Sequence, residues 1–190
     1  MKFNFKLFML SFFLISMSSC EKKQEKNLKS VTELTIGTKL MIPSNLTLYN
    51  HPSSGYNVDS TEIANSKYKI YSHINVSCST CLEEISLWAD IITSFKSYQV
   101  PVILICSSHD NFELIMHLFE TNKIKNFSYP IFFDLDDDYI EKNKFMDKEN
   151  HFKTVLTDSE NKILLLGNPI YSKKIKEMYL NELRKRTTRP

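Results

Sequence analysis

The chain alternates short apolar runs with stretches in which apolar residues recur every three or four positions. Five runs rich in apolar and β-branched residues predict strands: 68–74, 101–106, 129–133, 151–157 and 162–166. Three stretches with helical spacing each predict a helix that buries one face: 82–95, 110–119 and 172–183. The run 101–106 is almost wholly apolar, which is typical of a central parallel strand covered on both faces. This order of elements predicts an α/β fold with a central mixed sheet flanked by helices.

The residues before this region predict an N-terminal β-hairpin followed by a loop. Three short β-type runs occur there, broken by Pro43-Ser44-Asn45: 34–36, 39–42 and 46–49. The stretch 21–30 is charged and nearly free of apolar side chains, which favours a flexible spacer. We therefore expect four parts: a signal segment at 1–19, a tether at 20–33, the hairpin and loop at 34–66, and an α/β domain at 67–186.

The first twenty residues have the pattern of an export signal for a lipoprotein. Lys2 and Lys6 precede an apolar run that is too short to span a bilayer, and small residues stand directly before Cys20. This pattern predicts cleavage before Cys20 and lipidation of its sulfur, which would anchor the protein to a membrane of the cell envelope, facing the periplasm. The alternative is an ordinary signal peptide that contains a cysteine, and both interpretations place the domain outside the cytoplasm.

Composition excludes some functions. The chain has only 3 glycines and no Gly-rich phosphate-binding motif, which argues against a nucleotide site. Its formal net charge is +2, and removal of Lys2 and Lys6 with the signal segment would leave as many acidic as basic residues. A balanced charge gives no electrostatic case for binding nucleic acid.

Two cysteines three positions apart, Cys78 and Cys81, form the candidate site. They stand between a predicted strand and a predicted helix, where unpaired N–H groups and the helix dipole favour an anion. Cys78 is therefore expected to have a lowered pKa and to be the attacking sulfur, and Cys81 to resolve a mixed disulfide. An inert structural disulfide and a metal site remain alternatives, although no second pair completes a zinc ribbon. Cys106 ends an apolar run and is expected to be an inert core residue, with a third redox thiol as the alternative.

From about residue 67 to residue 183, the chain resembles the thioredoxin fold, and most closely the membrane-tethered thiol–disulfide oxidoreductases of the TlpA/ResA type. The resemblance rests on the Cys78–Cys81 pair and on Glu84, three positions later. It implies that Glu84 lies under the cysteines and tunes their ionisation; a surface carboxylate near the helix start is the alternative. Three further residues of this chain stand where the later strands of that family carry similar residues: Asp134, Thr154 and Asp158.

The same resemblance implies the partners. Clients would be proteins with cysteines or disulfides, and a membrane thiol carrier would be the redox partner, with neither cofactor nor metal. A thioredoxin-fold binding lipoprotein without catalysis, and a metal-handling protein, are the alternatives.

Three positions depart from the family pattern. Phe152 stands where most thioredoxin-fold oxidoreductases have a cis-proline that helps to position the substrate, and its preceding peptide bond is expected to be trans. His151 would then be able to approach Cys78, to stabilise a thiolate or to bind a metal; a plain loop histidine is the alternative. Ser77 replaces the usual aromatic residue before the first cysteine, and Ser86 replaces a proline that often kinks the helix.

Overall fold

A computed structural model describes residues 29–49, 60–124 and 127–187. The predicted signal segment and Cys20 lie outside the described residues, as does most of the predicted tether. The chain divides into two compact units, residues 1–35 and 36–190. In the first unit, residues 29–35 are helical. No helix in the described ranges combines the length and the apolar character needed to cross a bilayer.

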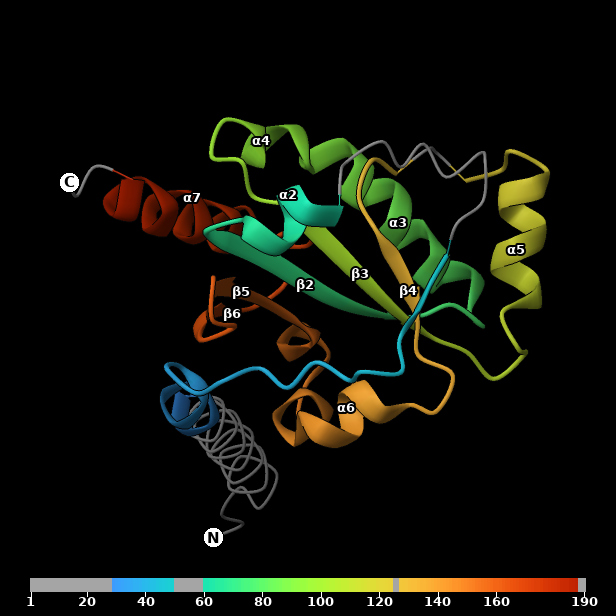
Figure 1. Cartoon of the computed structure of the whole chain (residues 1–190), viewed down its shortest axis with the longest axis horizontal. Coiled ribbons are helices and arrows are strands. Elements are labelled where there is room, and N and C mark those ends of the chain that lie inside the picture. The colour runs from blue at the N-terminus through green and yellow to red at the C-terminus, as the bar shows by residue number, and fades with distance from the viewer. Residues whose placement is uncertain (1–28, 50–59, 125–126, 188–190) are drawn as a thin grey trace, which may run out of the picture. The chain divides into compact units, whose positions relative to one another are not determined.

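The second unit is built around a mixed sheet of six strands in the order β1-β4-β3-β2-β5-β6 (Figure 1). The strands are β1 Thr47–Leu48, β2 Tyr68–Asn75, β3 Val102–Ser107, β4 Ile131–Phe133, β5 Thr154–Asp158 and β6 Ile163–Leu166. The pairs β2–β3 and β3–β4 are parallel, whereas β5 is antiparallel to both β2 and β6. The predicted mixed sheet is thus confirmed.

Helices and 3-10 turns cover the sheet. They are α2 Ser60–Asn65, α3 Ser79–Ile91, α4 Thr93–Lys96, α5 Glu113–Glu120, α6 Asp138–Lys142, η2 Lys144–Asp147, η3 Asn150–Lys153 and α7 Lys173–Thr187. Helices α3, α5 and α7 pack on one face of the sheet, in a core that contains Ile70, Ile74 and Trp88. On the other face, Tyr71 and Ile105 pack with residues of α6 and η2.

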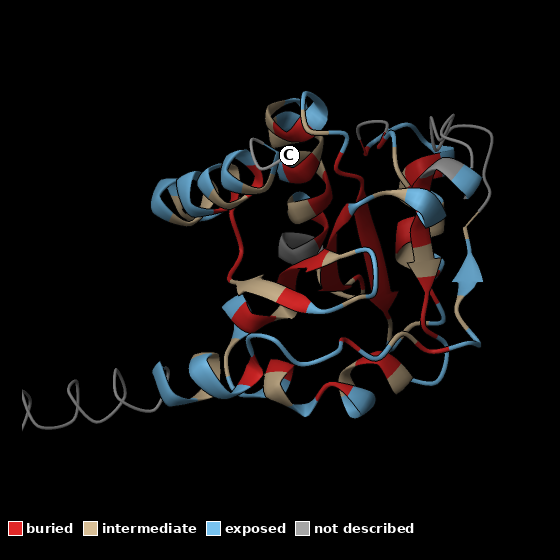
Figure 2. Cartoon of the chain, turned by 60° about the vertical axis from the view of Figure 1, so that its left-hand side comes forward, coloured by how far each residue is buried: buried red, intermediate tan, exposed pale blue. Residues whose placement is uncertain are grey.

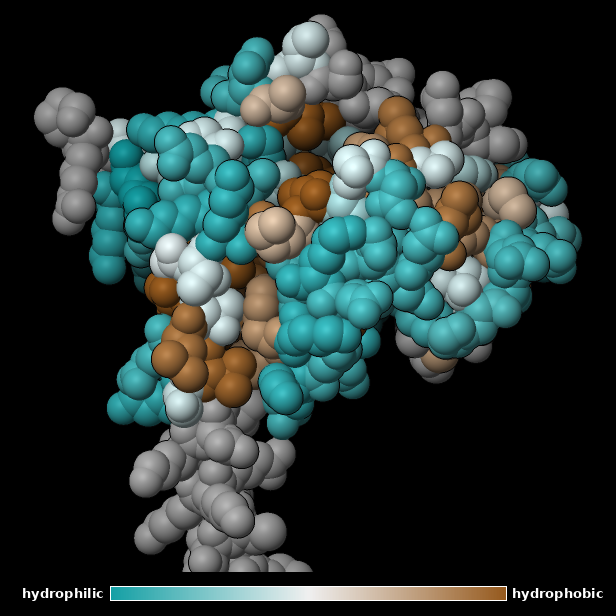
Figure 3. All heavy atoms as spheres, turned by 60° about the horizontal axis from the view of Figure 1, so that its bottom comes forward, coloured by the Kyte–Doolittle hydropathy of each residue, from teal (hydrophilic) through white to brown (hydrophobic). Residues whose placement is uncertain are grey.

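The central strands are buried because both faces of the sheet are covered. Every residue of β3 is buried, and β2 is buried up to Ile74 (Figure 2). This confirms the prediction that 101–106 forms a central strand. Hydrophilic residues predominate on the face shown in Figure 3, and apolar residues reach that surface in separate groups.

The N-terminal stretch forms no hairpin with itself within the described residues, which corrects the prediction for residues 34–49. Thr35 belongs to the helical segment, and its hydroxyl donates to the Val31 carbonyl oxygen at 2.7 Å. Farther along, Lys39 makes an isolated antiparallel bridge with Lys162, and β1 pairs with β4. The edges of the sheet at β6 and β4 present unpaired backbone groups with which this stretch can pair. A short hairpin would have fewer such bonds, because Pro43 has no backbone N–H.

The predicted strand 151–157 begins only at Thr154, because residues 150–153 form the 3-10 turn η3. The predicted helix 82–95 is divided into α3 and α4. Ser172 caps the start of α7, because its hydroxyl oxygen accepts the N–H of Ile175 at 3.3 Å. The predicted helix 172–183 forms as part of α7, but Met178 on its apolar stripe is exposed and does not face the core.

Candidate functional site

Cys78 lies where β2 gives way to α3. It is the N-cap residue of α3, with an extended backbone (φ −116°, ψ 123°), and its carbonyl oxygen accepts the Leu82 N–H at 3.1 Å. Its side chain is half-buried and makes no capping hydrogen bond. Cys81 lies in the first turn of α3, and its side chain is outside the described part of the structure. The sequence prediction of a strand, a cysteine and a helix start is therefore confirmed, whereas the pairing of the two sulfurs stays a prediction.

The loop before Cys78 is held by Ser77. The Ser77 N–H donates to Asn75 Oδ1 at 3.0 Å, and its hydroxyl oxygen accepts the His109 N–H at 2.5 Å. The hydroxyls of Ser77 and Ser108 also lie 3.2 Å apart. These bonds connect the cysteine loop to the loop that follows β3. The residue that replaces the usual aromatic thus anchors the backbone next to Cys78.

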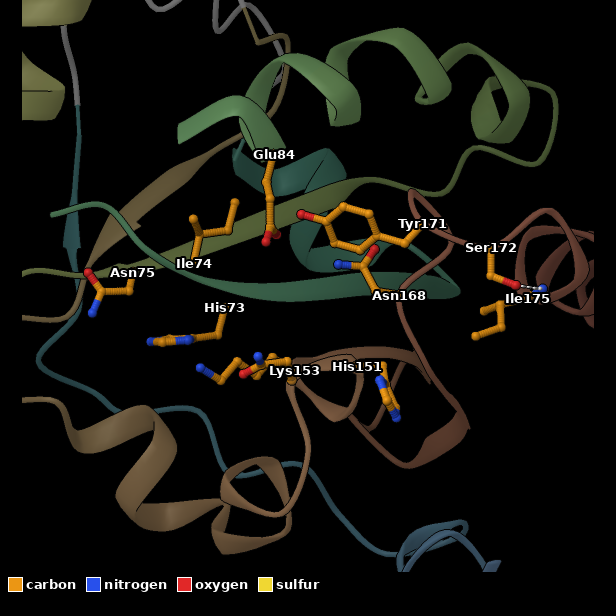
Figure 4. Close-up of a pocket in the computed structure, with 11 residues that line it drawn as sticks. His73, Ile74, Asn75, Glu84, His151, Lys153, Asn168, Tyr171, Ser172 and Ile175 are labelled. Carbon is orange, nitrogen blue, oxygen red and sulfur yellow. Dashed lines mark hydrogen bonds between the residues drawn. The ribbon is translucent and has the colours of Figure 1, made fainter. Parts of the chain in front are cut away.

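A cavity of about 490 Å³ opens beside this loop, between the end of β2, helix α3, η3 and the loop that leads into α7 (Figure 4). Its lining residues are two isoleucines and residues with polar or charged side chains: His73, Ile74, Asn75, Glu84, Asn150, His151, Lys153, Asn168, Tyr171, Ser172 and Ile175. The predicted residues Glu84 and His151 are brought together here. Lys153, Asn168 and Tyr171 were missed, because no spacing in the sequence connects these positions to the cysteines.

Glu84 points into this cavity from α3 (Figure 4). Burial raises the pKa of its carboxyl group above the ordinary value, while a hydrogen bond from the Tyr171 hydroxyl and the charge of Lys153 act in the opposite direction. The negative charge of Glu84 also raises the pKa of the buried Cys106 thiol. Glu84 is therefore a half-buried group with a perturbed pKa, in contrast to the alternative of a plain surface carboxylate.

Phe152 and His151 occupy the turn before β5. Phe152 is buried, and its preceding peptide bond is trans, since no cis bond occurs among the described residues. His151 is exposed, and its ring meets that of Phe152 edge-on at 5.6 Å between centroids. Substrate positioning by these two residues stays a prediction.

His73 is a buried histidine at the cavity, and no motif in the sequence indicates its place there. Its Nε2 lies 3.0 Å from the Ser107 hydroxyl, and its Nδ1 is buried without a hydrogen-bond partner among the described residues. Burial, with a smaller contribution from Lys153, lowers its pKa from 6.5 to about 3. The imidazole is therefore neutral at physiological pH.

Cys106 is fully buried at the end of β3, and burial raises the pKa of its thiol far above the ordinary value, with Glu84 adding to the effect. This agrees with the expected core cysteine, because a thiol that stays protonated is a poor nucleophile. No group of three or more His, Cys, Asp or Glu side chains in the described residues could hold a metal ion.

The three residues of the later strands have local structural partners. Asp134 accepts the N–H groups of Asp138 at 3.1 Å and Tyr139 at 2.8 Å, at the start of α6. The hydroxyls of Thr154 and Ser72 lie 2.8 Å apart in the core. Asp158 accepts two backbone N–H groups in the turn between β5 and β6.

No protein-family model matches the chain, and no curated protein matches it. Solved structures do. A solution structure from Bacteroides thetaiotaomicron, described as a candidate protein disulfide isomerase, is 21% identical with a TM-score of 0.50, over 79% of this chain and 90% of that one. A crystal structure from Chlorobium tepidum, described as a candidate thiol:disulfide interchange protein DsbE, is 13% identical with a TM-score of 0.51, over 78% of this chain and 97% of that one. Together with the strand order and the position of Cys78, these likenesses show that the chain has a thioredoxin-like fold.

Proposed function

We propose that this protein is an extracytoplasmic thiol–disulfide oxidoreductase, anchored to a membrane by a lipid on Cys20, which exchanges disulfides with client proteins through Cys78 and Cys81. The observation that carries the proposal is the placement of Cys78 at the N-terminus of α3, directly after a central strand of a thioredoxin-like sheet. The positive end of the helix dipole stabilises a thiolate at this place.

In the reducing direction, the Cys78 thiolate attacks one sulfur of a client disulfide. A Cys78–client disulfide forms, and the second client sulfur leaves as a thiolate that takes up a proton. The Cys81 thiolate then attacks the Cys78 sulfur, which releases the client as a dithiol and leaves the Cys78–Cys81 disulfide. Two electrons pass to the client, and a membrane thiol carrier would return them. The reverse sequence would oxidise clients.

Glu84 is the candidate proton carrier for this exchange. Its half-buried carboxyl group lies in α3, one helical turn after Cys81, and has a raised pKa. A carboxyl group whose pKa is moved toward neutrality is better able to exchange protons with thiols, whose ordinary pKa is about 8.5.

Insulin reduction with a dithiol donor tests the proposal. Wild-type protein should accelerate the appearance of turbidity, and Cys78→Ser should abolish the acceleration. Cys106→Ala is the matched control, because it removes a buried thiol outside the proposed site. Equal rates for wild type and Cys78→Ser would refute the proposal.

One observation favours a second candidate, a binding lipoprotein in which the cysteine pair is only structural. Phe152 has a buried aromatic side chain and a trans peptide bond where a substrate-positioning cis-proline is usual. A redox titration separates the two candidates. A structural disulfide would have a reduction potential below about −300 mV, whereas a working pair would titrate at a higher potential.

A further inference from the structure

The cavity at the end of β2 holds a positive and a negative group that lie beyond ion-pair distance of each other. Lys153 enters it from η3, and within the described residues its ammonium group has no acidic partner at ion-pair distance. Glu84 enters from α3 and receives a hydrogen bond from the Tyr171 hydroxyl. In Figure 4 the two side chains project into the cavity from its opposite sides.

A second observation points to a polar occupant. His73 is 5% exposed and lines the cavity, and its Nδ1 is buried without a hydrogen-bond partner among the described residues. A buried polar atom without a partner costs free energy unless water or a ligand satisfies it. Asn168 is also buried at the cavity, where its Oδ1 accepts the Ile170 N–H at 3.1 Å.

We propose that this cavity binds the α-amino-acid group of a small thiol or disulfide, with the ligand's carboxylate on Lys153 and its ammonium on Glu84. A zwitterion supplies one opposite charge for each of these two groups, which neither a simple anion nor a simple cation does. The volume of about 490 Å³ falls within the range of small-molecule sites and suits a ligand the size of cystine or a short peptide.

This inference rests on the proposed function, because it supplies that site with a substrate class. The Cys78 thiolate would attack the disulfide RS–SR, forming Cys78–S–S–R and releasing one RS⁻. The Cys81 thiolate would then displace the second RS⁻ and close the Cys78–Cys81 disulfide. The two protons of the protein dithiol pass to the two released thiolates, so that one disulfide is reduced as the other forms.

Two disulfides test the inference, one that carries amino-acid groups and one that carries no charge. The reduced protein is mixed with cystine or with uncharged hydroxyethyl disulfide, and the loss of protein thiols gives the rate constant for each. Lys153→Gln should slow the reaction with cystine about tenfold more than it slows the reaction with hydroxyethyl disulfide, which has no carboxylate for Lys153 to bind. Lys162→Gln, which removes an exposed lysine outside this cavity, should change neither rate. An equal effect on both disulfides, or none on either, would overturn the inference.

Calorimetric titration with S-methylcysteine tests binding without redox chemistry. The probe has the same amino-acid group but a thioether in place of the thiol, so its binding does not need reactive cysteines. Binding that Lys153→Gln weakens about tenfold supports the site, whereas no binding overturns it. If neither disulfide reacts with wild-type protein, the proposed function fails, and the titration still decides whether the cavity is an amino-acid site.

Discussion

The buried imidazole of His73 should make the folded protein lose stability in acid. The side chain projects from β2 into the core on the α6 side of the sheet, where its ring stacks 6.2 Å from that of Tyr139. Its Nε2 bonds to the Ser107 hydroxyl, and the charge of Lys153 acts on it from η3. Burial disfavours the charged imidazolium, and the positive charge of Lys153 adds to this effect, which is why the pKa of His73 falls from 6.5 to about 3.

The direction of this pH dependence follows from proton binding at His73 in the folded and unfolded states. The unfolded chain binds a proton at His73 below pH 6.5, whereas the folded chain binds one only below about pH 3. Stability is therefore greatest above pH 6.5 and is lost as the pH falls toward 3. Each pH unit within this interval costs at most about 1.4 kcal/mol, so between pH 6 and pH 4 His73 should remove roughly 2 to 3 kcal/mol from the free energy of unfolding.

Urea denaturation at pH 6, 5 and 4 measures this loss. His73→Gln keeps a polar side chain but cannot take up a proton, so its free energy of unfolding should fall less steeply with acid than that of wild type. The difference between the two proteins isolates His73 from the carboxyl groups, which titrate in both. His117→Gln, in which an exposed histidine of α5 is replaced, should keep the wild-type slope. Parallel curves for wild type and His73→Gln would refute the assignment.

Two further predictions concern the end of the sheet. Gly167→Ala should destabilise the fold by roughly 1 to 3 kcal/mol, because φ is +124° and a new Cβ would lie 2.9 Å from Ile175 Cδ1. Gly37→Ala should cost less, since its φ is also positive but the nearest atom lies at 3.7 Å; urea midpoints that rank the two in the opposite order contradict this. Tyr179→Phe should cost about 1 to 2 kcal/mol, because the buried hydroxyl donates to the Gly167 carbonyl oxygen at 2.8 Å, and an unchanged thermal midpoint would argue against that bond.

Local pattern was enough to predict the central strands and the helix after the cysteines. An apolar run such as 101–106 is stable in the middle of a sheet that is covered on both faces. The pattern failed between residues 138 and 153, where α6, η2 and η3 form from short polar stretches. Asp134 helps to start them by accepting two backbone N–H groups, in a turn that the sequence shows only as acidic.

By itself, the sequence determined the thioredoxin-like order of elements and the position of Cys78 at a helix start, since both depend on neighbours along the chain. Only the tertiary structure decided which side chains share the cavity at the end of β2. Glu84, Lys153 and Tyr171 come from α3, η3 and the loop before α7, and they meet because three segments converge at one end of the sheet. This convergence raises the pKa of Glu84 and leaves Nδ1 of His73 without a hydrogen-bond partner among the described residues. Both effects depend on which groups are neighbours in space and not on which are neighbours in the sequence.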